Sequence, residues 1–163
     1  MSVVERYQML YEYEKDCNQK TLAMIESVPE ANRSDPRFQR IVSLAYHLAA
    51  CRKSWLDHMD GSGANQIPQM DENCQLATLR PLFTEVEGLW TDYLAKLKDE
   101  DLPRDFEFSE GEETFSLPIE TQTIQLMGHA FYHRGQIVVL VDQLGGNTVD
   151  TEYADWWWYA NNT

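Results

Sequence analysis

The sequence predicts an all-α protein, a four-helix bundle that forms a single domain over residues 1–163, with a small β-hairpin before the last long helix. Four long segments carry apolar residues at steps of three and four, the spacing of one buried helix face. Pro and Gly separate these segments, and one short stretch alternates with a period of two instead. At 163 residues, of which 43% are hydrophobic, the chain can bury one such core.

The first helix is expected from about Ser2 to Val28, because Pro29 lies just past its apolar stripe. Glu14 falls on this stripe, which places its carboxylate either at the end of the buried zone or toward a polar site. The stripe consists of Tyr7, Leu10, Tyr11, Cys17, Met24 and Val28.

The second helix is expected from Pro36, with Asp35 as its N-cap, to about Met59, where Gly61-Ser62-Gly63 ends it. Residues 61–77 are rich in Gly, Asn and Gln and are interpreted as a linker. A third helix is expected from about Thr78 to Lys98.

The alternating stretch from Phe106 to Leu117 predicts the β-hairpin, and Pro118 then opens the fourth helix, which should run to Leu144. Gly145-Gly146 stops it. The tail that follows is too aromatic to be solvated, so it should pack on the bundle or on a partner subunit. Its aromatic residues are Tyr153, Trp156, Trp157, Trp158 and Tyr159.

The fourth segment contains HAFYHRGQ, in which His129 and His133 are four residues apart and leave the same helix face. Such a pair is either a core pair satisfied by hydrogen bonds or a pair of metal ligands. If the second and fourth helices are neighbours, His47 can join the pair. Three imidazoles leave a coordination position open and suit zinc, nickel, copper or iron, and binding should weaken as the pH falls through about 6.5.

Two other side chains of the second helix bear on this site. Cys51 lies one turn beyond His47, and can be either an inert buried thiol or a further ligand. His58 is almost in line with His47, but its place near the helix end favours an exposed histidine.

The chain is strongly acidic, with 13 Lys and Arg against 27 Asp and Glu and a formal net charge of −14. This balance argues against nucleic-acid binding and against adsorption to anionic membranes. No apolar run is long enough for a membrane span, and the first residues contain no secretory signal. Three cysteines without a CxxC pair favour reduced thiols, so a cytoplasmic location is expected.

Three sequence patterns stand out: YHLAACRKSW in the second helix, HAFYHRGQIVVLVDQLGG in the fourth, and DTEYADW in the tail. Together they resemble the DinB/YfiT-like family of metal-binding proteins. The resemblance covers most of the chain, and HxxxHRGQ is its most specific part. It implies an up-down-down-up bundle, a divalent metal on His47, His129 and His133, and frequent homodimers. It does not imply the DNA polymerase that shares the family's name.

In the same motif, Arg134 is interpreted as an ion-pair or surface residue, and Gly135 as a position of close helix packing. Gln136 is interpreted as a residue that orients a ligand or a partner helix.

The resemblance also implies a metal-dependent enzyme that acts on small electrophilic substrates, as a low-molecular-weight-thiol S-transferase or as a hydrolase. Its cofactor would be a divalent transition metal, zinc or nickel, with the thiol as co-substrate, and Glu14 is the candidate acid-base residue. One alternative is a non-enzymatic metal-binding stress-response protein. The other is a bundle whose histidines are only structural.

Overall fold

A computed structural model of the chain describes residues 1–62 and 67–162. All four predicted long helices and the predicted hairpin are present, and every long helix begins and ends within two residues of its predicted bounds. The elements are α1 (Val3–Glu26), α2 (Pro36–Asp60), α3 (Leu76–Lys96), β1 (Asp105–Glu110), β2 (Glu113–Pro118), α4 (Ile119–Gln143) and α5 (Tyr153–Asn162). Two short 3-10 helices, Glu30–Asn32 and Asp99–Asp101, lie in the connections.

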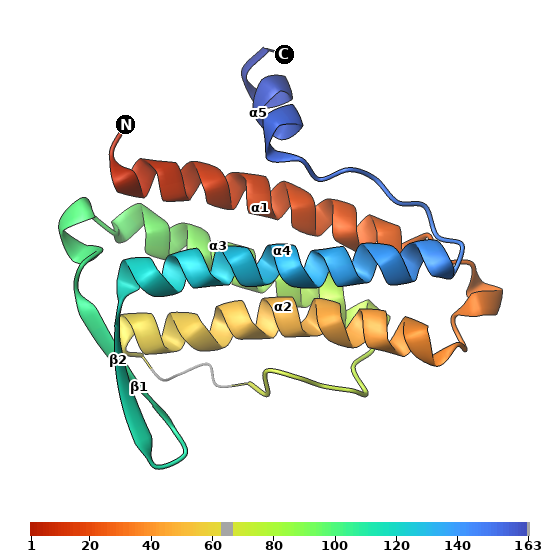
Figure 1. Cartoon of the computed structure of the whole chain (residues 1–163), viewed down its shortest axis with the longest axis horizontal. Coiled ribbons are helices and arrows are strands. Elements are labelled where there is room, and N and C mark those ends of the chain that lie inside the picture. Colours follow the sequence, from red (N-terminus) through yellow and green to blue (C-terminus); the bar gives the residue numbers. More distant parts are fainter. Residues whose placement is uncertain (63–66, 163) are drawn as a thin grey trace.

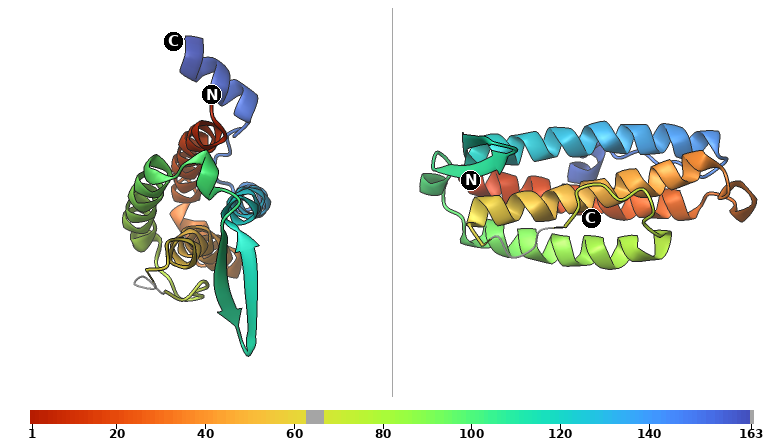
Figure 2. Two further views of the ribbon diagram at one scale, coloured as in Figure 1. Left: turned by 90° about the vertical axis from the view of Figure 1, so that its left-hand side faces the viewer. Right: turned by 90° about the horizontal axis from the view of Figure 1, so that it is seen from below.

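The four long helices form an up-down-down-up bundle, as the family resemblance implied. α1 and α4 run in one direction, and α2 and α3 run in the other (Figures 1 and 2). Seen along the bundle axis, α4 and α3 each lie between α1 and α2 (Figure 2). α2 and α4 are therefore antiparallel neighbours, which is the arrangement that a site built from His47 and the pair on α4 requires.

The helix ends follow from local hydrogen bonds. Ser2 and Glu5 form a capping box at the start of α1, and the carboxylate of Asp35 accepts the backbone N–H of Arg37 at 2.9 Å at the start of α2. Gly61, with φ +74°, ends α2 as expected. The next part of the predicted linker, residues 63–66, lies outside the described residues.

The core is built around Trp90 of α3, which is fully buried between α1 and α2. Its ring lies 6.0 Å from that of Tyr11, and its indole N–H donates to the backbone carbonyl of Arg52 at 2.8 Å. Aliphatic residues of all four helices surround this centre, among them Leu22, Ile25, Ile41, Leu79, Ile119 and Ile137.

The hairpin projects from one end of the bundle (Figure 2) and is attached to α2 by aromatic contacts. The ring of Phe108 lies 4.7 Å from that of Trp55 and 6.1 Å from that of His58. His58 is therefore half-buried under the hairpin, and the prediction that it is exposed at the helix end was wrong. It remains outside the histidine cluster described below.

The aromatic tail forms a helix, α5, which the sequence analysis did not predict (Figure 1). Tyr153 and Trp156 pack on Tyr13 of α1, with ring centroids 5.1 and 5.6 Å from it, as the expectation of packing on the bundle requires. Trp158 and Tyr159, in contrast, are 59% and 65% exposed, so the expectation that the tail avoids solvent holds only for its first turn. Contact with a partner subunit stays a prediction. Among the described helices, none is both long and apolar enough to span a membrane.

Candidate metal centre

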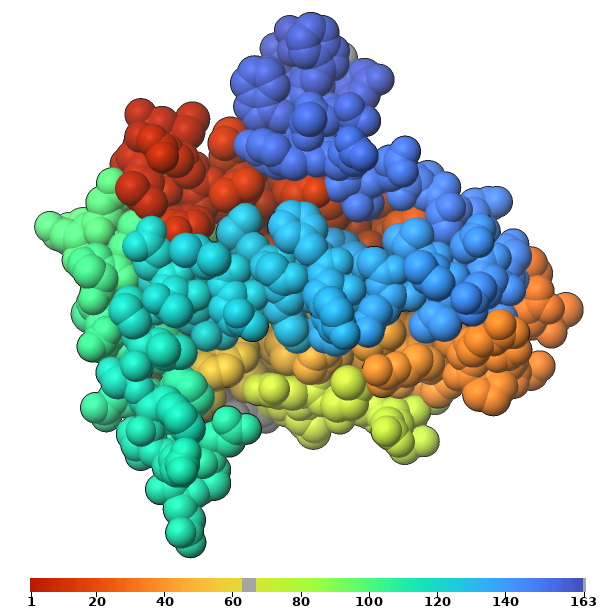
Figure 3. Space-filling view, in the orientation of Figure 1, coloured from red at the N-terminus to blue at the C-terminus, as the bar shows by residue number. Residues whose placement is uncertain are grey.

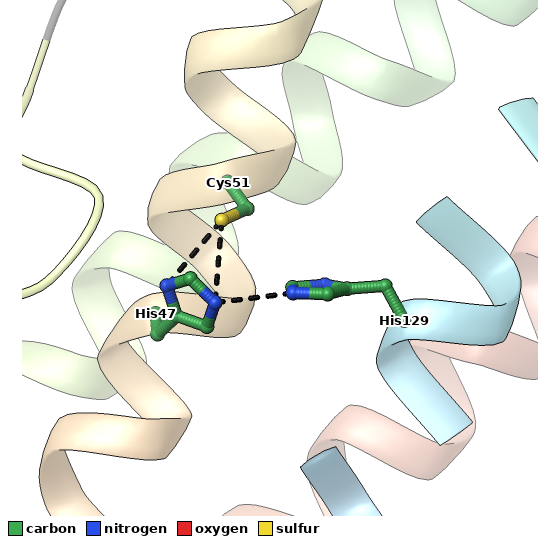
Figure 4. A group of neighbouring side chains, drawn as sticks. All are labelled: His47, Cys51 and His129. Atoms are coloured by element: carbon green, nitrogen blue, oxygen red, sulfur yellow. Dashed lines mark hydrogen bonds between the residues drawn. The ribbon is translucent and has the colours of Figure 1, made fainter. Parts of the chain in front are cut away.

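Two histidines from different helices meet with their ring nitrogens facing each other. Nε2 of His47, on α2, lies 3.1 Å from Nε2 of His129, on α4 (Figure 4). Two imidazoles that bind one ion at about 2.1 Å place their nitrogens about 3.0 Å apart at octahedral angles and about 3.4 Å apart at tetrahedral ones. The observed separation therefore fits a shared divalent ion.

His133 lies beside this pair, one turn beyond His129 on the same helix. Its ring centroid is 4.5 Å from that of His129 and 4.9 Å from that of His47, and all three rings meet edge to face. The structure thus brings together the three histidines that were predicted as ligands. Within the described part of the chain, however, the group whose donor atoms all lie within 4.8 Å of one another is His47, Cys51 and His129.

Hydrogen bonds hold two of the rings in the tautomer that a metal ligand needs. Nδ1 of His47 donates to the backbone carbonyl of Gln69 at 2.7 Å, so its Nε2 presents a lone pair. Nδ1 of His133 lies 2.7 Å from the amide oxygen of Gln136, which leaves Nε2 of His133 in the same state. Such outer partners orient the imidazoles that bind metals. The interpretation of Gln136 as an orienting residue fits this contact.

Cys51 adds a sulfur to the donor set. Its Sγ lies 3.6 Å from Nε2 of His47, close to the separation of about 3.6 Å expected for a sulfur and a nitrogen on one tetrahedral zinc ion. The thiol also donates to the side-chain oxygen of Gln69 at 3.7 Å. Burial raises the pKa of Cys51 to about 11, which keeps the free thiol protonated at neutral pH. An inert buried thiol and a further metal ligand are therefore both compatible with the position of Cys51.

The environment favours the neutral form of two of the imidazoles, His129 and His133. Burial lowers the pKa of His129 to about 4, and the neighbouring His133, His47 and Arg52 act in the same direction. Burial also lowers the pKa of His133, assisted by His47 and Arg40 and opposed by the hydrogen bond to Gln136. Because only a neutral imidazole binds a metal, His129 stays competent well below pH 6.5, where the sequence analysis expected proton competition to begin.

The low pKa of His129 predicts how the metal-free protein responds to acid. In the unfolded chain this side chain gains a proton near pH 6.5, whereas in the folded chain it does so near pH 4. Its contribution to stability is therefore fully present above pH 6.5 and is lost as the pH falls from 6.5 through 4. We expect the free energy of unfolding of the metal-free protein, measured by urea titration after chelation, to fall more between pH 7 and pH 5 for the wild type than for His129→Gln. Equal losses would contradict the neutral state of His129.

Glu14, the candidate acid-base residue, lies in the bundle core rather than among the histidines. Both of its oxygens accept hydrogen bonds from the guanidinium of Arg52, one of them at 2.9 Å, and both side chains are about 7% exposed. Arg52 also stacks over Trp90, 4.8 Å from the ring centroid. This ion pair holds both oxygens of Glu14 in the core, and the catalytic role of Glu14 stays a prediction.

Arg134, in the same motif as the histidines, is only 4% exposed, so the surface position considered for it was wrong. Its guanidinium donates to the side chain of Asn18 at 3.3 Å and lies 5.2 Å from the ring centroid of Phe131. Asn18 in turn donates to the carboxylate of Glu87 at 3.1 Å. This chain of contacts joins α4, α1 and α3 behind the histidines.

Gln69 was not predicted as a site residue, yet it contacts the site through its backbone carbonyl and its side chain. Its amide also donates to Ser54 at 3.3 Å. Gln69 lies in the connection after α2, where no periodic pattern marks a position. Only the return of this connection along α2 brings it to His47 (Figure 1).

Comparison with known proteins agrees with the fold. The model of the DinB family matches residues 1–162, nearly the whole chain. No curated protein and no solved structure matches the chain. Since the family match extends across all the helices and includes both histidine-bearing segments, the chain belongs to the DinB family.

Proposed function

We propose that this DinB-family protein is a metal-dependent enzyme that transfers a low-molecular-weight thiol to small electrophilic substrates. The observation that carries the proposal is the convergence of His47 and His129, 3.1 Å apart at Nε2, with His133 beside them. Zinc or nickel suits this set of imidazoles. His47, His129 and His133 would hold the ion, and Gln69 and Gln136 would keep two of them in the binding tautomer.

A positive side chain lies close to the site in a protein that is otherwise strongly acidic. The charge of Arg40 acts on His133, and Arg40 has no ion-pair partner among the described residues, whereas Arg52 is paired with Glu14. Such a local field favours an anion, and a thiolate is the reactive form of a thiol. A bound divalent ion would supply the remaining effect by lowering the pKa of the thiol.

The test is turnover of monochlorobimane with bacillithiol, mycothiol or glutathione. In this reaction the thiol loses its proton, a sulfur–carbon bond forms and chloride leaves. We expect a rate that disappears on chelation, returns with added zinc or nickel, and is absent in His129→Ala. No metal-dependent rate with any of the three thiols would rule out the transferase. Hydrolysis of a small ester, followed under the same conditions, is the alternative reaction of the same site.

The position of Cys51 favours a second candidate function, a non-enzymatic metal-binding protein. If Cys51 joins all three histidines, four protein atoms complete a tetrahedral zinc site and exclude water and substrate. The two functions differ in the number of protein side chains that bind the metal, three in the enzyme and four in the non-enzymatic protein. A retained metal without turnover of any thiol or ester would favour this second candidate.

A further inference from the structure

We infer that the groove between α2 and α4 binds an amphipathic acid, a small molecule with an apolar body and a terminal carboxylate that pairs with Arg40. This inference rests on the proposed function in one respect, since the far end of the ligand would reach the histidines. Binding in the groove itself is independent of the metal.

The groove has the size and the lining of a small-molecule site. Its volume is about 530 Å³, within the range of ligand pockets. Leu140, Tyr132 and Val139 form its apolar surface, the last two being 64% and 56% exposed, whereas Leu44 is only 1% exposed and lies beneath this surface. The lining consists of Arg40, Leu44, Tyr132, Gly135, Gln136, Val139 and Leu140. Figure 3 shows this face of the molecule, with α4 running along it and the start of α2 next to it.

Arg40 is the only charged side chain of this lining. It is exposed and has no hydrogen bond or ion pair within residues 1–62 and 67–162. Arg37, three residues earlier on α2, is instead bound to Asp35 at 2.7 Å. A guanidinium next to apolar surface, without a carboxylate partner in the part of the chain that the structure describes, is suited to bind an anion through paired hydrogen bonds.

The groove is connected to the histidines by two of its own residues. Gln136 binds Nδ1 of His133 through its amide oxygen, so its N–H groups remain available as donors to a ligand. The ring of Tyr132 lies 5.0 Å from that of His133. Arg40 and His47 are seven residues apart on α2, a rise of about 10 Å. An acid of about this length would place its far end beside the histidines while its carboxylate meets Arg40.

Gly135 provides a way to fill the groove without disturbing the fold. It is exposed, and an added Cβ would meet no atom within 4 Å. Among the described residues no neighbouring element packs on Gly135, so the expected close helix packing does not occur within this part of the chain, and packing against a second subunit stays a prediction. A leucine at this position would occupy the groove and would also favour the helix.

The experiment is calorimetric titration of octanoate, which is about 10 Å long, with octanol as the uncharged match. The proteins are the wild type, Arg40→Gln and Gly135→Leu, with Arg37→Gln as the control on the same helix, each as purified and after chelation. We expect octanoate to bind the wild type and Arg37→Gln equally, to bind Arg40→Gln at least about fivefold more weakly, and to be excluded by Gly135→Leu. Octanol should not distinguish Arg40→Gln from the wild type.

Three results would overturn the inference: no octanoate binding to the wild type, equal binding to Arg40→Gln, or equal binding to Gly135→Leu. A different set of results would assign the groove to a second copy of the chain. In that case the wild type sediments as a dimer, Gly135→Leu sediments as a monomer, and octanoate does not compete with dimer formation. Metal content measured on the same samples separates the two proposals. Octanoate binding without any metal binding would support the groove as a binding site and rule out the proposed function. Metal binding without octanoate binding would overturn this inference and leave the proposed function standing.

Discussion

Replacement of His129 by alanine is expected to lower the affinity for zinc at least about tenfold, with the helical content unchanged. His129 supplies one of the two nitrogens that face each other at 3.1 Å, and loss of even an outer partner of a ligand typically costs about tenfold to a hundredfold in affinity. Zinc titration against a competing chelator measures the effect, and circular dichroism shows whether the fold is retained.

His58→Ala is the matched control, because His58 lies on α2 but contacts Trp55 and Phe108 instead of the cluster. Its affinity for zinc should equal that of the wild type. His47→Ala and His133→Ala should behave like His129→Ala. If His133→Ala alone retained full affinity, the ligand set would be the group of His47, Cys51 and His129.

Arg52→Met should produce the largest loss of stability, roughly 3–5 kcal/mol, the typical cost of removing one partner of a buried ion pair. The substitution leaves the carboxylate of Glu14, itself buried, without the guanidinium that binds both of its oxygens. It also removes the contact between Arg52 and the ring of Trp90. The free energy of unfolding from urea titration measures the effect.

The double variant Glu14→Leu, Arg52→Met serves as the control, because it removes both charges and fills the space with apolar atoms. It should recover most of the stability lost in Arg52→Met. A cost below about 1 kcal/mol for Arg52→Met would contradict the structural importance of the pair. Turnover by the double variant also tests the predicted role of Glu14, since an acid-base residue could not be replaced by leucine without loss of rate.

The bundle was predictable because each long helix has a strong apolar period and a marked start or end, such as Asp35-Pro36 before α2 and Gly61 after it. The up-down-down-up order came from the family resemblance, since apolar periods do not determine which helices become neighbours. α5 was missed because its ten residues are fewer than the window over which an apolar period can be recognised, and its first turn is fixed by contacts with Tyr13.

The candidate site was predictable in its histidines and much less so in the residues around them. His129 and His133 are recognisable from their spacing. The buried face of α4 passes through Ala130, Arg134 and Ile137, so Arg134 lies in the interior and the histidines lie at the edge of this face, toward α2. Spacing alone does not show which residues of such a motif are buried, and the contact of Gln69 with His47 depends on a connection that has no apolar period.

The presence of a metal on these histidines is tested most directly by X-ray absorption at the zinc edge, on untagged protein whose metal content has been measured. We expect about one ion per chain with imidazole scattering from His47, His129 and His133, and any sulfur scattering would come from Cys51. An ion bound by oxygen atoms alone, or no stoichiometric ion after zinc addition, would contradict a histidine metal centre.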